Sequence, residues 1–60
     1  MLITLNGEKT TTAGLTLYEM ILEKGFTLDT VIAEVNLQLI KKEDWRQTAL
    51  NEGDTVELLS

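Results

Sequence analysis

The chain has 60 residues, of which ten are acidic and five basic, giving a net charge of −5, and it contains neither cysteine nor histidine. This length fits one small domain. The absence of cysteine and histidine excludes disulfides, soft metal sites and nucleophile systems based on a thiol or a histidine. That absence argues against an enzyme. The net negative charge favours a protein partner over nucleic acid or anionic lipid. No apolar run approaches the ~20 residues that a bilayer crossing needs, and we expect a cytoplasmic domain.

The first expected elements are two strands joined by a tight turn. Residues 1–5 are rich in leucine and β-branched side chains, and Asn6-Gly7 is a strong signal for a hairpin. Residues 8–12 then form the return strand. Its threonines suit a sheet, but it lacks large apolar side chains, which places it at an edge.

A short helix is predicted next. Thr16 is its expected N-cap, Glu19 completes a capping box, and Leu15 is positioned to pack on Met20 as a hydrophobic staple. Gly25 supplies the left-handed stop. A helix of ~14 Å is too short to be stable alone and needs a sheet to pack against. The side chains expected to face that sheet are Leu17, Met20 and Ile21.

Two further strands are expected at 31–35 and 38–40, separated by a turn at Asn36-Leu37. Alternation directs three side chains of the first strand inward and leaves Ile32 and Glu34 outward. The inward set is Val31, Ala33 and Val35.

A short helical turn at 41–47 and a last strand from Thr55 to the final residue complete the predicted elements. Trp45 and Leu50 are expected to plug the end of the core. In the last strand, period-2 alternation turns Val56 and Leu58 inward. Its outward residues are Thr55, Glu57 and Leu59.

This order of elements predicts one α+β domain over residues 1–60. The hairpin before the helix and the parallel return after it favour a mixed four- to five-stranded sheet that grasps one helix, with the first and last strands adjacent and parallel at the centre. That layout is the β-grasp, or ubiquitin-like, fold.

The polar clusters are interpreted as structural, so no catalytic, cofactor-binding or metal-ligating residue is predicted. Glu43-Asp44 is typical of a helix start, where the dipole favours acidic residues, and Asp54 is a turn residue beside Glu52. The doublet Lys41-Lys42 lacks interleaved aromatics and indicates solubility rather than phosphate binding.

The outward apolar residues Leu2, Ile32 and Leu59 are the candidate partner-contact face. If the first, last and third strands are neighbours, these side chains lie side by side opposite the helix, as at a protein-binding surface. The alternative is that each is one of the single exposed apolar residues that any protein carries. The expected rim of the face is Thr4, Glu34 and Glu57.

The chain resembles the ThiS-type sulfur carriers of bacterial thiamine biosynthesis. The resemblance covers essentially the whole chain and is most specific between Asn36 and Asp54, where an Asn ends a strand, a basic residue precedes Trp45, and a Gly-Asp turn closes the block. Lys41 departs from the family, which often has proline there. The motifs that carry the resemblance are Asn6-Gly7, Thr16-Leu17-Tyr18-Glu19, Val35-Asn36, Ile40, Lys42-Glu43-Asp44-Trp45, Gly53-Asp54 and Val56.

The resemblance implies a non-catalytic carrier. Family members end in a Gly-Gly tail whose carboxylate an E1-like adenylyltransferase adenylates; a sulfur-donating enzyme then supplies sulfur, and the thiocarboxylate is delivered to thiazole synthase. This sequence ends at Leu59-Ser60 without Gly-Gly, so Ser60 is the expected attachment point of a tail. We expect a monomer when the carrier is free.

Three alternatives stay open from the sequence. One is a carrier like the small subunit of molybdopterin synthase, which shares the fold and the tail. Another is a regulatory β-grasp module of the TGS type, although the acidity and the Trp45 block argue against it. The third is an interaction domain that acts only through its exposed apolar face.

Overall fold

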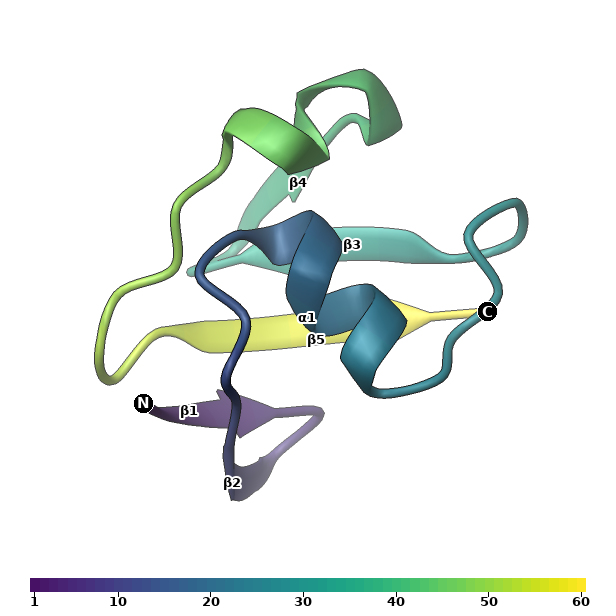
Figure 1. Ribbon diagram of the computed structural model, residues 1–60. Helices are drawn as coiled ribbons and strands as arrows, with labels where there is room; N and C mark the ends of the chain where they lie inside the picture. Colours follow the sequence, from purple (N-terminus) through teal and green to yellow (C-terminus); the bar gives the residue numbers. More distant parts are fainter.

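The sheet of the computed structural model, which describes residues 1–60, has five strands in the order β2-β1-β5-β3-β4 (Figure 1). The two central strands β1 and β5 are parallel, and the other neighbouring pairs are antiparallel. The bounds are Leu2–Leu5 for β1, Glu8–Thr11 for β2, Ile32–Val35 for β3, Gln38–Ile40 for β4 and Thr55–Leu59 for β5. Figure 1 shows one helix, α1 (Leu17–Glu23), lying across one face of this sheet. The predicted α+β β-grasp fold is confirmed.

The first hairpin turns where the sequence predicts it. Asn6 and Gly7 both adopt left-handed backbone conformations, with φ of 50° and 85°. Positive φ at both central residues matches the twist of the flanking strands, which is why Asn-Gly is favoured there. The return strand ends at Thr11, and Thr12 is already buried outside it.

The helix α1 begins at the predicted cap. The Glu19 amide donates to Thr16 Oγ1 over 3.2 Å, and Gly25 after the helix has a φ of 81°. The Glu19 carboxylate, however, accepts from the amide of Leu15 at 2.7 Å, one residue before the cap. Leu15 is 67% exposed whereas Met20 is fully buried, so the predicted staple contributes little.

The core lies between α1 and the sheet and contains 11 buried apolar residues. Alternation in β5 is as predicted, since only Val56 and Leu58 are buried there. Val31 is buried although β3 begins one residue later, at Ile32. The core residues are Ile3, Leu17, Met20, Ile21, Val31, Ala33, Val35, Trp45, Leu50, Val56 and Leu58.

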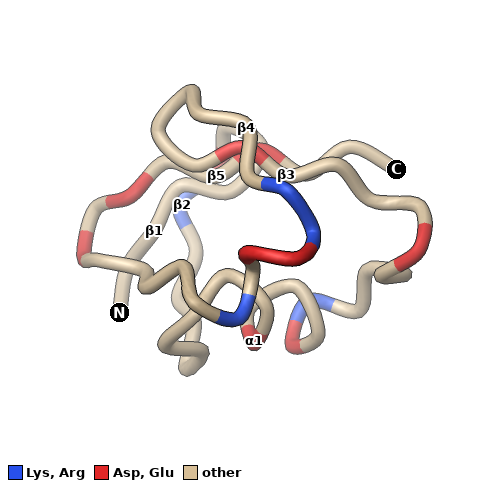
Figure 2. Tube along the Cα trace, turned by 90° about the horizontal axis from the view of Figure 1, so that it is seen from above, with Lys and Arg blue, Asp and Glu red and all other residues tan.

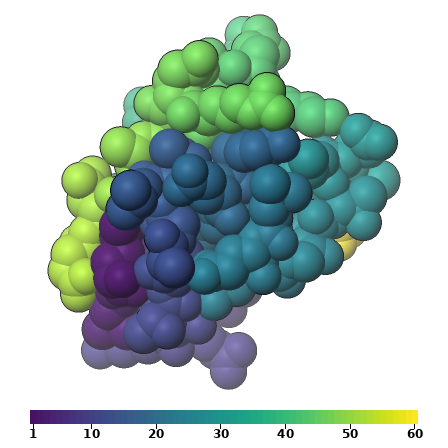
Figure 3. All heavy atoms as spheres, in the orientation of Figure 1, coloured from purple at the N-terminus to yellow at the C-terminus, as the bar shows by residue number.

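The predicted helical turn is a 3-10 helix, η1 (Lys42–Gln47), which covers one end of the core. Trp45 on η1 is 2% exposed, and its Nε1 donates to the Ile40 carbonyl over 3.0 Å. Glu43 lies in the first turn, as predicted. Figure 3 shows the green surface of η1 pressed against the blue surface of α1. The helix α1 is far too short to cross a membrane.

Candidate partner-binding face

The face of the sheet opposite α1 carries exposed apolar side chains. Ile32 and Leu59 are Cα partners in the antiparallel pairing of β3 with β5, and they are 55% and 64% exposed. Directly opposed residues of neighbouring antiparallel strands project to the same face. The structure therefore brings together these two of the three predicted contact residues.

Leu2 is exposed but does not join them. In the parallel pairing of β1 with β5, Thr4 lies opposite Thr55, and the Gly53 amide donates to the Leu2 carbonyl over 2.8 Å. Leu2 therefore lies before the start of β5, whereas Leu59 ends that strand about 20 Å away at ~3.3 Å per residue. The prediction that all three lie side by side is wrong for Leu2. The order of the strands could be predicted from the order of the elements in the sequence. The register of β1 with β5 could not, because it depends on hydrogen bonds to the turn before β5.

The same face carries three more residues next to the apolar pair. Glu34 on β3 lies opposite Glu57 on β5, and on its other side it lies opposite Leu39 on β4. Leu39 is 65% exposed and was not predicted to belong to the face; the signal for it is the alternation of β4 with partly buried Ile40. We call Ile32, Glu34, Leu39, Glu57 and Leu59 the open-face cluster.

The two carboxylates of the open-face cluster form no salt bridge within the chain. The one salt bridge of the structure joins Lys42 Nζ to Asp29 Oδ1 over 2.9 Å, away from the cluster. No hydrogen bond within the chain reaches either Glu34 or Glu57 through its side chain. Figure 2 shows acidic positions adjacent on β5 and β3. Like charges on directly opposed strands repel, so this arrangement does not stabilise the fold.

The strand that carries Leu59 is held by asparagines from the two left-handed turns. Asn6 hydrogen-bonds Leu58 on one flank of β5. On the other flank, Asn36 Oδ1 accepts from the Thr55 amide over 3.0 Å, and its Nδ2 donates to Asp54 Oδ1 over 3.1 Å. The direction of β5 toward Ser60 is thereby fixed on both sides.

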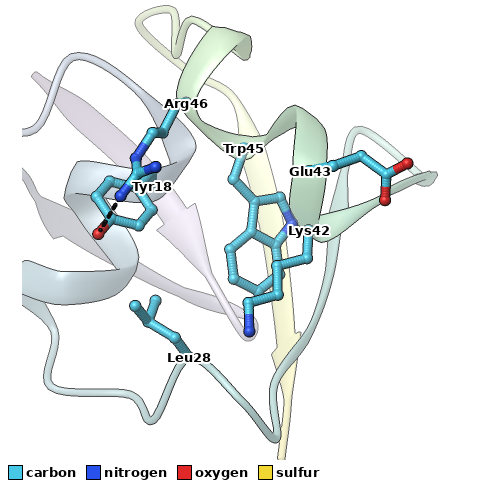
Figure 4. Close-up of a pocket in the computed structure, with 6 residues that line it drawn as sticks. All are labelled: Tyr18, Leu28, Lys42, Glu43, Trp45 and Arg46. Atoms are coloured by element: carbon cyan, nitrogen blue, oxygen red, sulfur yellow. Dashed lines mark hydrogen bonds between the residues drawn. The ribbon is translucent and has the colours of Figure 1, made fainter.

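A second feature is a hollow of about 390 Å³ between α1 and η1 (Figure 4). The Arg46 guanidinium lies 4.3 Å from the centre of the Tyr18 ring, and its Nη2 donates to the Tyr18 hydroxyl over 3.0 Å. Lys42 is paired with Asp29, and Glu43 points away from the hollow in Figure 4. Both cations are thus engaged within the chain, and Arg46 acts as a brace between α1 and η1. The lining residues are Tyr18, Leu28, Lys42, Glu43, Trp45 and Arg46.

The acidic side chains do not gather into a metal site, because no group of three or more is placed to hold an ion. One carboxylate, that of Glu23, has a shifted pKa. The Thr12 hydroxyl and the Ala13 amide both donate to Glu23, and these bonds lower its pKa from the ordinary 4.5. Asp54, which is buried, accepts from the Asn51 amide over 2.8 Å and closes the turn, as predicted.

A mixed five-stranded sheet with one helix on one face and a partly apolar open face defines a small domain of the ubiquitin-like β-grasp class. The model of the ThiS family matches residues 3–60, and the chain belongs to that family.

Two solved structures have folds that closely match the fold of this chain. The crystal structure of a thiamine biosynthesis protein (ThiS) from Geobacter metallireducens is 30% identical, with a TM-score of 0.86 over 98% of this chain and 91% of that one. A solution structure of a thiamine biosynthesis protein from the same organism is 28% identical, with a TM-score of 0.83 over 98% of this chain and 81% of that one. Among curated protein sequences, none matches this chain.

Proposed function

We propose that this domain is a sulfur carrier for the formation of the thiazole of thiamine, and that it is a protein substrate rather than an enzyme. The match of the ThiS family model to residues 3–60 carries the proposal. The likeness to structures described as thiamine biosynthesis proteins supports the thiamine branch over the molybdopterin branch.

In this proposal the reactive group is the carboxylate of a Gly-Gly tail attached at Ser60. An E1-like adenylyltransferase joins this carboxylate to the α-phosphate of ATP and releases pyrophosphate. A sulfide equivalent from the sulfur-donating enzyme then displaces AMP and leaves a thiocarboxylate, which thiazole synthase consumes. Glycines suit such a tail because an unbranched backbone passes through a narrow channel.

The structure supports this role through the geometry of the last strand. β5 lies between β1 and β3, and asparagine side chains fix it on both flanks. Ser60 is exposed just after the strand ends at Leu59. A rigid strand that ends at the surface holds an attached tail at a defined place relative to the open-face cluster. One enzyme can then bind the cluster and position the tail for reaction at the same time.

The decisive experiment uses the chain extended by Gly-Gly after Ser60. With ATP and the cognate E1-like enzyme we expect the intact mass to rise by one adenylate, and with a sulfur donor we expect the adenylate to be replaced by a thiocarboxylate. A control chain extended by Gly-Ala should react far less. If the enzyme is active on another carrier but never adenylates the Gly-Gly chain, the proposed function is wrong.

The partner-contact role of Ile32 and Leu59 is part of the same proposal. Both are exposed and opposed on neighbouring strands, so a partner can bury them together. Changing Ile32→Asp should weaken binding to the E1-like enzyme while leaving the free energy of unfolding nearly unchanged. The control is Leu15→Asp, because Leu15 is 67% exposed but precedes α1. Equal binding by the Ile32 variant and the wild type would remove this face from the proposal.

A further inference from the structure

The open-face cluster combines exposed apolar side chains with two carboxylates that form no salt bridge within the chain. Apolar residues lie on two sides of the carboxylates: Ile32 and Leu59 form the next opposed pair on the same face of β3 and β5, and Leu39 on β4 lies opposite Glu34. Exposed apolar side chains that gather beside polar groups are typical of a protein contact surface. The composition of this face indicates the chemistry of what covers it.

The spacing of the two carboxylates allows them to share one cation. Glu34 and Glu57 are Cα partners on adjacent antiparallel strands, which places their Cβ atoms about 4.5–5.5 Å apart on the same face. Each glutamate side chain is long enough to turn toward a group above the midpoint of the pair. In the free protein neither carboxylate forms a salt bridge with a lysine or with Arg46, since the one salt bridge of the chain is Lys42–Asp29.

A guanidinium fits this position better than an ammonium ion. It presents several N–H donors in one plane, so that it can serve two carboxylates at once. It is also more weakly hydrated, which suits a site that becomes enclosed by aliphatic side chains. Once water is excluded, the attraction between the guanidinium and the two carboxylates is strengthened.

A second copy of this chain is a poor occupant for the same face. The chain carries a net charge of −5, and its single arginine, Arg46, is held against Tyr18 on η1. A two-fold symmetric contact places the same patch on both sides. It would therefore oppose two acidic pairs with no cation between them. The charges favour a different protein with a basic contact surface.

We propose that the E1-like enzyme of the carrier function argued above inserts one arginine between Glu34 and Glu57, while its apolar residues cover the aliphatic side chains of the cluster. This inference rests on the proposed function and adds the chemistry of the partner's contact surface. It assigns Glu34, Glu57 and Leu39 to partner binding.

The test is titration calorimetry of the E1-like enzyme with the Gly-Gly-extended carrier at two salt concentrations. We expect Glu34→Gln and Glu57→Gln each to weaken Kd by at least ~tenfold and to reduce its dependence on salt, since each removes one charge from the pair. The matched control is Glu8→Gln, which changes net charge equally on the exposed edge strand β2. It should bind within about twofold of the wild type. Changing the partner's arginine to lysine should also weaken Kd.

The outcomes separate this inference from the proposed function. If both glutamine variants bind like the wild type while Ile32→Asp does not bind, the proposed arginine contact is refuted and the carrier function stands. If the carrier is adenylated but neither Ile32→Asp nor the glutamine variants alter Kd, the face is not used and the inference is overturned. If the wild-type carrier neither binds the enzyme nor is adenylated, the proposed function itself is refuted, and this inference is refuted with it. Self-association lost in Glu34→Gln would also overturn the inference.

Discussion

The side chain of Asn6 pairs with the backbone of Leu58 as a further strand residue would. Asn6 Nδ2 donates to the Leu58 carbonyl over 3.1 Å, and the Leu58 amide donates to Asn6 Oδ1 over 2.8 Å. The backbone amide of Asn6 also donates to the Val56 carbonyl over 2.9 Å. β1 ends at Leu5, so a turn residue completes the hydrogen bonding of the last strand beyond the reach of β1.

Asn6→Asp should therefore destabilise the protein. The carboxylate loses the Nδ2 donor and sets negative charge beside the Leu58 carbonyl, while Asp still tolerates the left-handed turn. We expect a loss of about 1 kcal/mol in the free energy of unfolding, measured by urea denaturation. Gln38→Glu makes the same change of charge at an exposed position and should be nearly neutral. Equal stability of the Asn6 variant and the wild type would show that the side-chain pair does not hold β5.

Gly14 is required because its Cα lies against the first turn of α1. A Cβ added there would lie 2.8 Å from the Met20 amide nitrogen and 3.1 Å from Met20 Cα, and both are backbone atoms. Gly14→Ala should lower the free energy of unfolding by about 1–3 kcal/mol, because a helix backbone cannot yield as a flexible side chain can. The neighbouring variant Ala13→Ser, at an exposed position, should change it by less than about 0.5 kcal/mol. Thermal and urea unfolding of both would decide the point.

Glu23 makes stability depend on acid pH. Its folded pKa lies below 4.5 because the Thr12 hydroxyl and the Ala13 amide donate to its carboxylate. A carboxylate with a lowered folded pKa stabilises the fold fully above its unfolded pKa, and that contribution is lost as pH falls through the folded value. Glu23→Gln should therefore be less stable than the wild type at pH 7, and the difference should shrink below pH 4.5. Glu8→Gln, whose carboxylate accepts no hydrogen bond in the chain, should show no such convergence.

Sequence patterns predicted the elements of this fold because each has a local cause. Asn6-Gly7, Thr16 and Gly25 specify a turn, a cap and a stop through their own backbone preferences, and alternation alone identifies Val56 and Leu58 as buried. The predicted capping box differs in one partner, because the Glu19 carboxylate accepts from the amide of Leu15 and not from that of the cap residue Thr16.

The contact face was predicted only in part because it depends on non-local register. Ile32 and Leu59 meet in an antiparallel pairing, whereas the place of Leu2 along β5 is set by Gly53 and its hydrogen bond to Leu2. Nothing in the local pattern of β1 specifies that offset. The sequence predicted Glu34 and Glu57 at the rim of this face, but their direct opposition is seen only in the register of β3 with β5.

Trp45 joins the helical turn η1 to the sheet through both volume and one hydrogen bond. It is 2% exposed, and its Nε1 donates to the Ile40 carbonyl over 3.0 Å at the end of β4. Trp45→Phe leaves a void in a small core and removes one hydrogen bond from that carbonyl, so we expect a loss of about 2 kcal/mol in the free energy of unfolding. The aromatic control is Tyr18→Phe, because the Tyr18 hydroxyl meets only the exposed Arg46. It should cost less than about 0.5 kcal/mol. If the two variants, followed by far-ultraviolet circular dichroism in urea, unfold at the same midpoint, then Trp45 does not contribute the expected stability through its volume and its hydrogen bond.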